Sequence, residues 1–218
     1  FAAIQEATMA DVSETKKRSP QSPGRLYDLT TLQREENRLH SYPASRTLQI
    51  AQSLYERHKL ITYPRTDSKA LPEDYGPMCR DLLGSIQGEF GPHAQKALQS
   101  NWVDEKNKKI FNNKQISDHF AIIPTTGTPS NLDANERKIY NLITKRFISV
   151  FYPPAQWDVT TRTSSIKEYN FKTEGRVLVD PSWLAIYGKD NQPEDTLPAL
   201  TPEDNNQANL VKSDLENE

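Results

Sequence analysis

The chain has 218 residues and is nearly neutral, with 27 Lys and Arg, 29 Asp and Glu and a formal net charge of −2. Its mean hydropathy of −0.78 and its lack of any apolar run of about 20 residues exclude a membrane-spanning helix. The single cysteine, Cys79, excludes an internal disulfide, and no group of Cys and His has the spacing of a zinc site. The length suits one large domain or two modest ones. Because the chain starts at Phe1 without a leader, we expect a piece of a longer cytoplasmic protein.

Charge is unevenly distributed along the chain. Residues 14–65 contain ten Lys and Arg against five acidic residues, whereas residues 190–218 contain eight acidic residues and one Lys. A cluster of cations is typical of a nucleic-acid-binding segment, although ordinary solvated faces give the same pattern. Two interpretations therefore stay open: a basic DNA-facing segment beside an acidic tail, or solvated faces with a frayed terminus.

The N-terminal part is predicted to contain a strand, a linker and two helices. The strand is expected around Ala7 to Glu14. Residues 15–25 combine cations, prolines and a glycine without an apolar residue, which is typical of a linker. Asp28 is suited to cap a helix through about Arg38. Ser45 is expected to cap the next helix, because apolar residues then recur at helical spacing.

The rest of the chain is predicted to be helical first and extended later. Helical spacing predicts helices over residues 71–87 and 92–99, and a long helix from Asp133 to about Phe151. Pro153 and the proline after it would end that helix. From residue 157 to residue 179 apolar residues alternate with polar ones, which predicts a β region.

The run from Thr62 to Ser68 pairs a potential nucleophile, Tyr63, with a cation, Arg65. The phenol of a free tyrosine has a pKa of about 10, so it attacks a phosphodiester only where a base or a positive field favours the phenolate. A guanidinium supplies such a field and binds phosphate oxygens with its planar fork. Pro64 restricts the backbone between the two side chains. The same letters also fit a turn after a strand with a half-buried tyrosine.

Three further blocks accompany this run in a fixed order: Leu26 to Glu35, Ser45 to Glu56, and Asp118 to Thr125. With Thr62 to Ser68, they resemble the central region of type IA DNA topoisomerases, and most closely the topoisomerase III members of bacteria. The resemblance runs from about residue 10 to about residue 190. It implies that single-stranded DNA is cleaved, that a strand is passed and that the break is then resealed.

The resemblance also implies roles for individual residues. Tyr63 matches the tyrosine that becomes joined to a 5′ DNA phosphate, and Arg65 matches an arginine that stabilises the phosphate. His119 matches a position near the DNA, where a histidine touches a phosphate or modulates the tyrosine. Arg46, on the helix before the motif, is a candidate contact to the DNA backbone, although an exposed helix arginine is as often only solvated. Tyr55 is expected to pack in the core.

The implied fold is a mixed α/β, multidomain fragment. A mainly helical, winged-helix-like domain over residues 25–152 would be inserted into a β-rich gate domain. That gate domain would consist of residues 1–24 and 153–218, and the end of its acidic tail is expected to be disordered. In the family the two domains form part of a ring that encloses DNA.

The metal chemistry is expected to lie outside this chain. No acidic triplet with metal-ligand spacing appears in the sequence, so no metal site is expected here. In the family, Mg²⁺ is bound by carboxylates of a separate N-terminal domain. We therefore expect the chain to be inactive alone, to work with the remaining domains of the same polypeptide and with single-stranded DNA, and to have no membrane partner. A cytoplasmic, nucleoid-associated location in a bacterium is expected.

Two other classes of enzyme with a tyrosine nucleophile fit the sequence less well, and two non-catalytic alternatives remain. Relaxases need a His-x-His cluster, and the four histidines never sit two apart. Tyrosine recombinases need a His-x-x-Arg set that is missing here. The alternative that stays open is a non-catalytic winged-helix module that binds DNA, in which Tyr63 stacks on a base or packs internally. A purely architectural gate fragment is a third possibility.

Overall fold

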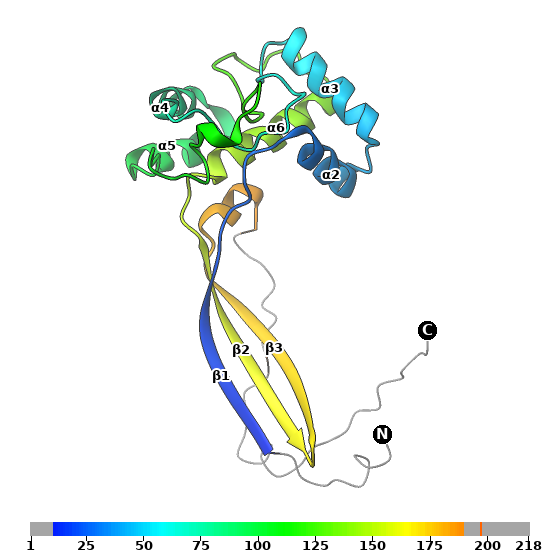
Figure 1. Ribbon diagram of the computed structural model, residues 1–218, viewed down its shortest axis with the longest axis vertical. Coiled ribbons are helices and arrows are strands. Elements are labelled where there is room, and N and C mark those ends of the chain that lie inside the picture. Colours follow the sequence, from blue (N-terminus) through cyan, green and yellow to red (C-terminus); the bar gives the residue numbers. More distant parts are fainter. Residues whose placement is uncertain (1–10, 190–196, 198–218) are drawn as a thin grey trace. The chain divides into compact units, whose positions relative to one another are not determined.

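The computed structural model describes residues 11–189 and Leu197, and these residues fold into two compact units. The sheet unit contains the described residues up to Gln21 together with Ala155–Pro181. The helical unit contains Ser22–Pro154 together with residues 182–189. The chain is therefore mixed α/β, as predicted (Figure 1). Apart from Leu197, the acidic tail lies outside the described residues, as does the predicted start of the first strand at Ala7.

The sheet unit is a three-stranded antiparallel sheet in the order β1-β2-β3 (Figure 1). Its strands are β1 (Asp11–Gln21), β2 (Ala155–Ile166) and β3 (Tyr169–Asp180). The β region predicted from residue 157 onward is thus confirmed as a hairpin. The buried Trp157 anchors one end of the sheet, because its indole N–H donates to Gln21 at 2.8 Å and the Arg176 guanidinium lies 4.7 Å from its ring.

The linker predicted over residues 15–25 is wrong for most of its length, because β1 continues to Gln21. Long-range pairing overrides the weak local strand propensity of this segment. Arg18 forms an ion pair with Asp158 across the strands at 2.5 Å, and Arg162 forms another with Glu14 at 2.7 Å. β1 is an edge strand of this sheet, and an edge strand tolerates a proline such as Pro20 because its open side has no neighbouring strand to bond.

The helical unit is built from five α-helices and three short 3₁₀ helices among the described residues. The α-helices are α2 (Leu29–His40), α3 (Ala44–Glu56), α4 (Gly76–Ser85), α5 (Gly91–Gln99) and α6 (Ala134–Ser149). The 3₁₀ helices are η1 (Gly88–Phe90), η2 (Asn113–Gln115) and η3 (Ser182–Tyr187). None of the described helices is both long and apolar enough to cross a membrane.

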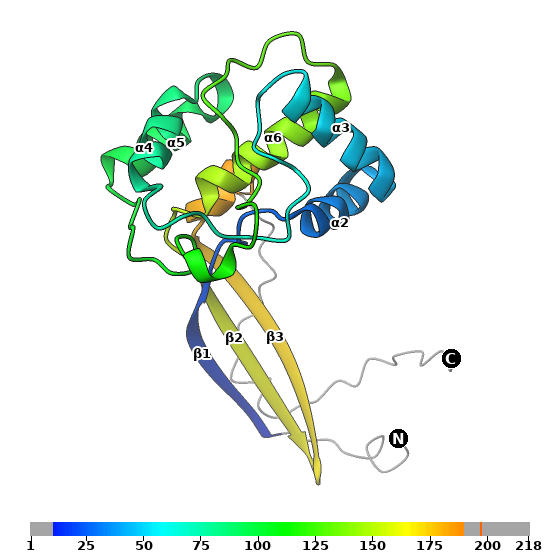
Figure 2. The ribbon, with the colours of Figure 1, turned by 45° about the horizontal axis from the view of Figure 1, so that its top comes forward.

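Helix α6 is the centre of the helical unit, with α2 and α3 on one side and α4 and α5 on the other (Figure 2). Ile139 and Ile143 pack into one apolar cluster with residues of α2 and α3. Phe147 and Ile148, one turn further on, pack into a second cluster with residues of α4 and α5. One helix therefore positions both halves of the unit through successive turns along its length.

Two of the predicted helix starts are confirmed by their caps. Asp28 accepts a hydrogen bond from the Thr31 N–H at 2.6 Å at the start of α2. Asp133 forms a capping box with Glu136 at the start of α6, which ends near the predicted position.

Two other predicted helix starts are wrong. Ser45 caps nothing, because α3 begins at Ala44 with Pro43 in the capping position. The helix predicted from Leu71 begins only at Gly76, because the Leu71 N–H donates to the Ile110 carbonyl at 2.7 Å and its backbone is therefore extended.

The larger part of the helical unit, Ser22–Pro154, lies in sequence between β1 and β2 of one sheet. The predicted division had placed residues 182–189 with the strands, whereas η3 groups with the helices. Ser182 donates to the Pro153 carbonyl at 2.6 Å, which keeps the start of η3 beside the end of the helical unit. The domain division at residues 24/25 and 152/153 stays a prediction.

Candidate active site around Tyr63

The segment that carries Tyr63 is extended and is tied to the segment from His119 to Ile123. The Thr62 N–H donates to the Ile123 carbonyl at 3.0 Å, and its hydroxyl donates to the Ala121 carbonyl at 2.9 Å. The Thr66 hydroxyl donates to the His119 carbonyl at 2.8 Å. The threonines on either side of Tyr63 thus hold the two sequence blocks together through hydrogen bonds between segments that are far apart in the sequence.

Tyr63 is half-buried between two other rings. Tyr55 of α3 meets it edge-on, with ring centroids 5.4 Å apart and an interplanar angle of 78°. His119 lies on it with centroids 4.3 Å apart and an angle of 42°. No hydrogen bond holds the Tyr63 hydroxyl within the part of the chain that the structure describes. The ring is therefore positioned by packing, which leaves its oxygen unengaged by those residues.

Arg65 is exposed, and the side-chain amide of Gln52 faces its guanidinium. With the amide oxygen turned toward Arg65, the distances are 3.2 Å to Nε and 3.0 Å to Nη2. A guanidinium has only donors, so the oxygen and not the NH₂ group must face it. No ion pair with Arg65 occurs among residues 11–189, so its positive charge is not cancelled by a neighbouring carboxylate.

The structure brings His119 to Tyr63 but does not bring Arg46 there. His119 is exposed as well as packed on Tyr63, so its ring nitrogens can meet a ligand. Arg46 is exposed near the start of α3 and donates to Gln49 at 2.9 Å. Tyr55, which contacts Tyr63, lies about 14 Å further along the helix axis. Arg46 can therefore belong to the same surface only as a more distant contact.

Two residues of this site were not found by the sequence analysis, and both come from α3. Tyr55 was expected in the core, yet it is half-buried and packs on Tyr63. Gln52 precedes Tyr55 by three residues, so the two side chains share a helix face. The sequence shows that Gln52 and Tyr55 are three residues apart, but it does not show which segment their helix face contacts.

A positively charged side chain lies near the site, just beyond the end of α3. Lys59, whose φ of 57° turns the chain out of α3, lies 5.6 Å from the Tyr55 ring centroid. The basic segment over residues 14–65 is not one surface, however. Its first cations lie on β1 in the sheet unit, and the others belong to the helical unit.

A buried charge network supports the chain behind the site. The Arg146 guanidinium lies 4.3 Å from the Tyr27 ring centroid and 2.6 Å from Glu35, and the Tyr27 hydroxyl also donates to Glu35 at 2.6 Å. Burial raises the pKa of Tyr27. Burial alone would lower the pKa of Arg146, but its electrostatic interactions with Tyr27, Tyr187 and Glu35 raise it. Arg146 therefore stays charged, and the Tyr27 carbonyl is held where it accepts from the Ile122 N–H at 2.8 Å.

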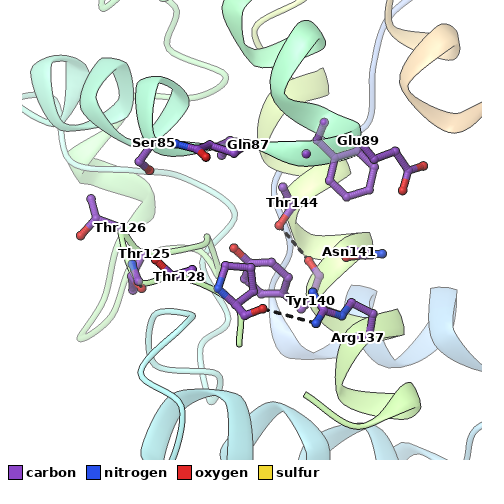
Figure 3. A pocket seen from close by; sticks show the side chains of 15 residues that line it. Ser85, Gln87, Glu89, Thr125, Thr126, Thr128, Arg137, Tyr140, Asn141 and Thr144 are labelled. Carbon is purple, nitrogen blue, oxygen red and sulfur yellow. Dashed lines mark hydrogen bonds between the residues drawn. The ribbon is translucent and has the colours of Figure 1, made fainter. Parts of the chain in front are cut away.

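A pocket of about 430 Å³ lies between α6, residues 85–90 and the loop Thr125–Pro129 (Figure 3). Its polar groups are partly engaged within the protein. Arg137 donates to the Pro129 carbonyl at 3.3 Å, and Thr144 donates to the Tyr140 carbonyl at 2.9 Å. Burial raises the pKa of Tyr140. None of the predicted site residues lines this pocket, so it is separate from the Tyr63 site.

The described residues contain no group of three or more His, Cys, Asp or Glu side chains that could hold a metal ion. The Mg²⁺ implied by the family resemblance therefore does not fit this part of the chain, and no chemical step is derived through it.

Comparison with known proteins places the chain in a family. The family model described as DNA topoisomerase matches residues 1–217. The chain therefore belongs to the DNA topoisomerase family, and the predicted resemblance to its type IA, topoisomerase III-like members is confirmed.

Individual relatives agree with this assignment. DNA topoisomerase 3 of Bacillus cereus is 39% identical over 186 residues, which cover 84% of this chain and 25% of that protein. DNA topoisomerase 3 of Bacillus subtilis is 39% identical over 205 residues, covering 89% of this chain and 28% of that protein. The chain thus spans about a quarter of the length of these curated relatives.

A solved structure shares the fold. Full-length topoisomerase I from Thermotoga maritima matches 92% of this chain and 32% of that chain, with a TM-score of 0.60 and 22% identity.

Proposed function

We propose that this chain is the part of a type IA DNA topoisomerase that carries the cleaving tyrosine, and that Tyr63 attacks single-stranded DNA. One observation carries the proposal. Tyr63 is wedged between Tyr55 and His119 with no hydrogen bond to its hydroxyl among the described residues, and the exposed Arg65 follows two residues later. Membership of the DNA topoisomerase family supports it.

The proposed reaction exchanges one P–O bond for another. The Tyr63 oxygen forms a bond to phosphorus, and the bond from phosphorus to the 3′ oxygen of the DNA breaks. The phenol loses its proton and the departing 3′ oxygen takes one up. The DNA then remains joined to Tyr63 through its 5′ phosphate. Because the exchange conserves the phosphoester, the reverse attack of the 3′ hydroxyl reseals the strand without ATP after a second strand has passed.

Arg65 and His119 are proposed to meet the phosphate. Negative charge builds on the non-bridging oxygens during attack, and a preorganised cation stabilises it most where water is partly excluded. Arg65 is exposed, forms no ion pair among the described residues and lies two residues after the nucleophile. His119 lies against the Tyr63 ring, where an imidazole N–H can donate to the same phosphate. Arg46 is proposed to contact the DNA backbone further along α3.

The winged-helix-like character of the helical unit is part of the proposal. α2 and α3 are joined by a short turn in which Ser41 has a φ of 56°. Gln33 of α2 donates to the Ala44 carbonyl at 3.0 Å, which fixes the angle between the two helices. After α3 the chain turns at Lys59 into an extended segment, in which Ile61 forms an antiparallel bridge with Pro124. This order of two helices followed by extended segments supports the assignment.

The remaining activity is proposed to need regions outside this chain. The chain covers about a quarter of its relatives' length, so we propose that the other domains hold Mg²⁺ and complete the DNA-enclosing ring. On this view the chain is inactive alone and acts on DNA in the bacterial nucleoid as part of the longer polypeptide. The insertion of a helical domain over residues 25–152 into a β-rich gate is part of the same proposal.

The test is Tyr63→Phe in a polypeptide that joins this chain to the regions that its relatives have outside the match. Loss of the attacking oxygen should abolish the covalent adduct with a single-stranded oligonucleotide, and the affinity for DNA should stay within a few-fold. Tyr55→Phe is the matched control, because it keeps the ring contact and should still form the adduct. An adduct mapped to any tyrosine other than Tyr63 would contradict the proposal. If neither protein forms an adduct but both bind DNA, the non-catalytic module is favoured.

A further inference from the structure

Gln52 is the only partner of the Arg65 guanidinium among the described residues, and it is neutral. With the amide assigned so that its oxygen faces Arg65, that oxygen lies 3.2 Å from Nε and 3.0 Å from Nη2, and it accepts from one edge of the guanidinium fork. The outward N–H groups of Arg65 remain directed away from this contact. A second acceptor with two oxygens can therefore bind them without displacing Gln52.

The neutrality of this partner sets Arg65 apart from arginines with a structural role. Arg146 is held by Glu35 at 2.6 Å, and Arg80 is held by Glu105 at 2.6 Å. A carboxylate holds a guanidinium strongly but also cancels its charge toward any third group. An amide fixes the orientation of the guanidinium and leaves its charge intact. Gln52 therefore does for Arg65 what an acidic partner could not do at a site that binds phosphate.

Helix α3 positions the cation and the nucleophile from the same face. Gln52 faces Arg65, and Tyr55, three residues later, packs on Tyr63. The helix itself is fixed to α6, because Ser53 of α3 and His58, just beyond its end, lie within hydrogen-bonding distance of Glu136, at 2.7 and 3.0 Å. The spacing of Arg65 relative to Tyr63 is thus set by two neighbouring side chains of one anchored helix.

We propose that Gln52 is a positioning residue for DNA cleavage, which holds the Arg65 guanidinium in the orientation that meets the scissile phosphate. The inference rests on the proposed function of Tyr63 and Arg65. An arginine side chain loses considerable rotamer freedom when it is fixed, and Gln52 removes that freedom before DNA binds. Its loss should therefore slow cleavage more than it weakens DNA binding.

The experiment is a double-mutant cycle in the full-length polypeptide, read as the rate of covalent adduct formation with a saturating single-stranded oligonucleotide. Gln52→Ala should slow the rate about tenfold, as expected for loss of one hydrogen bond to a charged group, with binding within two- to three-fold. Gln52→Ala should add no further loss in the Arg65→Ala background, because the group it positions is gone. Gln95→Ala, at an exposed position of α5, is the matched control and should leave the rate unchanged.

Gln52→Glu separates positioning from mere packing. It keeps the size of the side chain and holds Arg65 more tightly, but it cancels the charge that the phosphate needs, so the rate should fall further than with Gln52→Ala. Melting temperatures of all variants should stay within a few degrees, because Gln52 is only half-buried. A Gln52→Glu rate equal to the wild-type rate would overturn the inference. Losses that multiply when Gln52→Ala and Arg65→Ala are combined would also overturn it.

Failure of the inference can be told from failure of the proposed function. Tyr63→Phe is measured in the same assay. If Tyr63→Phe abolishes the adduct while Gln52→Ala has no effect, only the role of Gln52 is refuted. If Tyr63→Phe still forms the adduct, the proposed function fails, and the inference fails with it.

Discussion

The imidazole ring of His119 packs on the phenol ring of Tyr63, with centroids 4.3 Å apart and planes inclined by 42°. The contact does not depend on a flexible side chain alone. The His119 carbonyl accepts a hydrogen bond from Thr66, so the backbone of His119 is fixed relative to the segment that carries Tyr63. A substitution at His119 therefore changes the packing of the Tyr63 ring directly.

Replacing His119 separates two roles of its ring. His119→Ala removes both the packing and the N–H groups, whereas His119→Phe keeps a ring beside Tyr63. If His119 meets a phosphate, as proposed, both variants should weaken binding of single-stranded DNA several-fold, and phenylalanine should not restore cleavage. The measurements are oligonucleotide affinity and the rate of adduct formation in the full-length polypeptide. Full restoration of both by His119→Phe would show that packing on Tyr63 is the whole role.

Arg65→Ala should damage chemistry and spare folding. Arg65 is exposed and its partner in the described structure is a neutral amide, so its loss should leave the melting temperature within a few degrees. Cleavage should slow by roughly 10²-fold or more, as for loss of one contact to transition-state charge. Arg57→Ala, another exposed arginine next to α3, is the control and should cleave at nearly the normal rate. A large loss of stability with normal cleavage per folded molecule would reassign Arg65 to structure.

The acid stability of the helical unit should depend on Glu136. Burial would raise its pKa, but hydrogen bonds from Ser53, the Asp133 N–H and His58 outweigh burial and lower it. Because the folded pKa lies below the unfolded one, the stabilisation is present above the unfolded pKa, about 4.5, and is lost as the pH falls through the folded pKa. Glu136→Gln should therefore lower the unfolding free energy at pH 7 by about 1–3 kcal/mol.

The pH dependence supplies the check on that prediction. Below the folded pKa the carboxyl of the unchanged chain is protonated, so the difference between it and Glu136→Gln should shrink at acid pH. Denaturant unfolding of the 218-residue chain at several pH values measures it. A difference that is constant from pH 7 to pH 3 would mean that ionisation of Glu136 contributes nothing.

Arg146→Ala should destabilise the helical unit strongly. The side chain is 12% exposed, and its removal leaves the partly buried Glu35 with only the exposed Arg38, at 3.7 Å, as a cationic partner. It also leaves Tyr27 without the guanidinium on its ring. Loss of one member of a buried pair costs about 3–5 kcal/mol. Arg80→Ala is the contrasting control, because its pair with Glu105 is exposed and should contribute at most about 1 kcal/mol. Equal shifts of the urea midpoint for the two variants would contradict the assignment of Arg146 as the buried support.

Local signals in the sequence were enough for the caps and for the later strands. Asp28 and Asp133 were found because a short acidic side chain before a helical pattern has one common structural use. The β2–β3 hairpin was found because alternation over a long run has period two. The part of β1 from Thr15 onward was missed because its residues favour a linker locally, and only pairing with β2, far along the chain, makes the segment a strand.

Some residues of the candidate site were predicted from the sequence and others were not. Tyr63, Arg65 and His119 were identified through the family resemblance, and the structure adds that His119 lies against Tyr63. Gln52 and Tyr55 were missed because their role depends on which segment the α3 face meets, and that is a tertiary contact. Periodicity marks a shared helix face, but it does not say what covers that face.

The 218-residue chain by itself should bind single-stranded DNA without cleaving it. If Arg46, Lys59 and Arg65 each neutralise one phosphate, the logarithm of the binding constant should fall with the logarithm of salt concentration with a slope of about −2. A labelled oligonucleotide with Mg²⁺ should give no covalent product, because Arg65 alone offsets only part of the barrier to phosphodiester cleavage. Tyr63→Phe should bind with the same slope. A 5′-phosphotyrosine link formed by this chain at a useful rate, and lost in Tyr63→Phe, would show that the chain holds a complete active site.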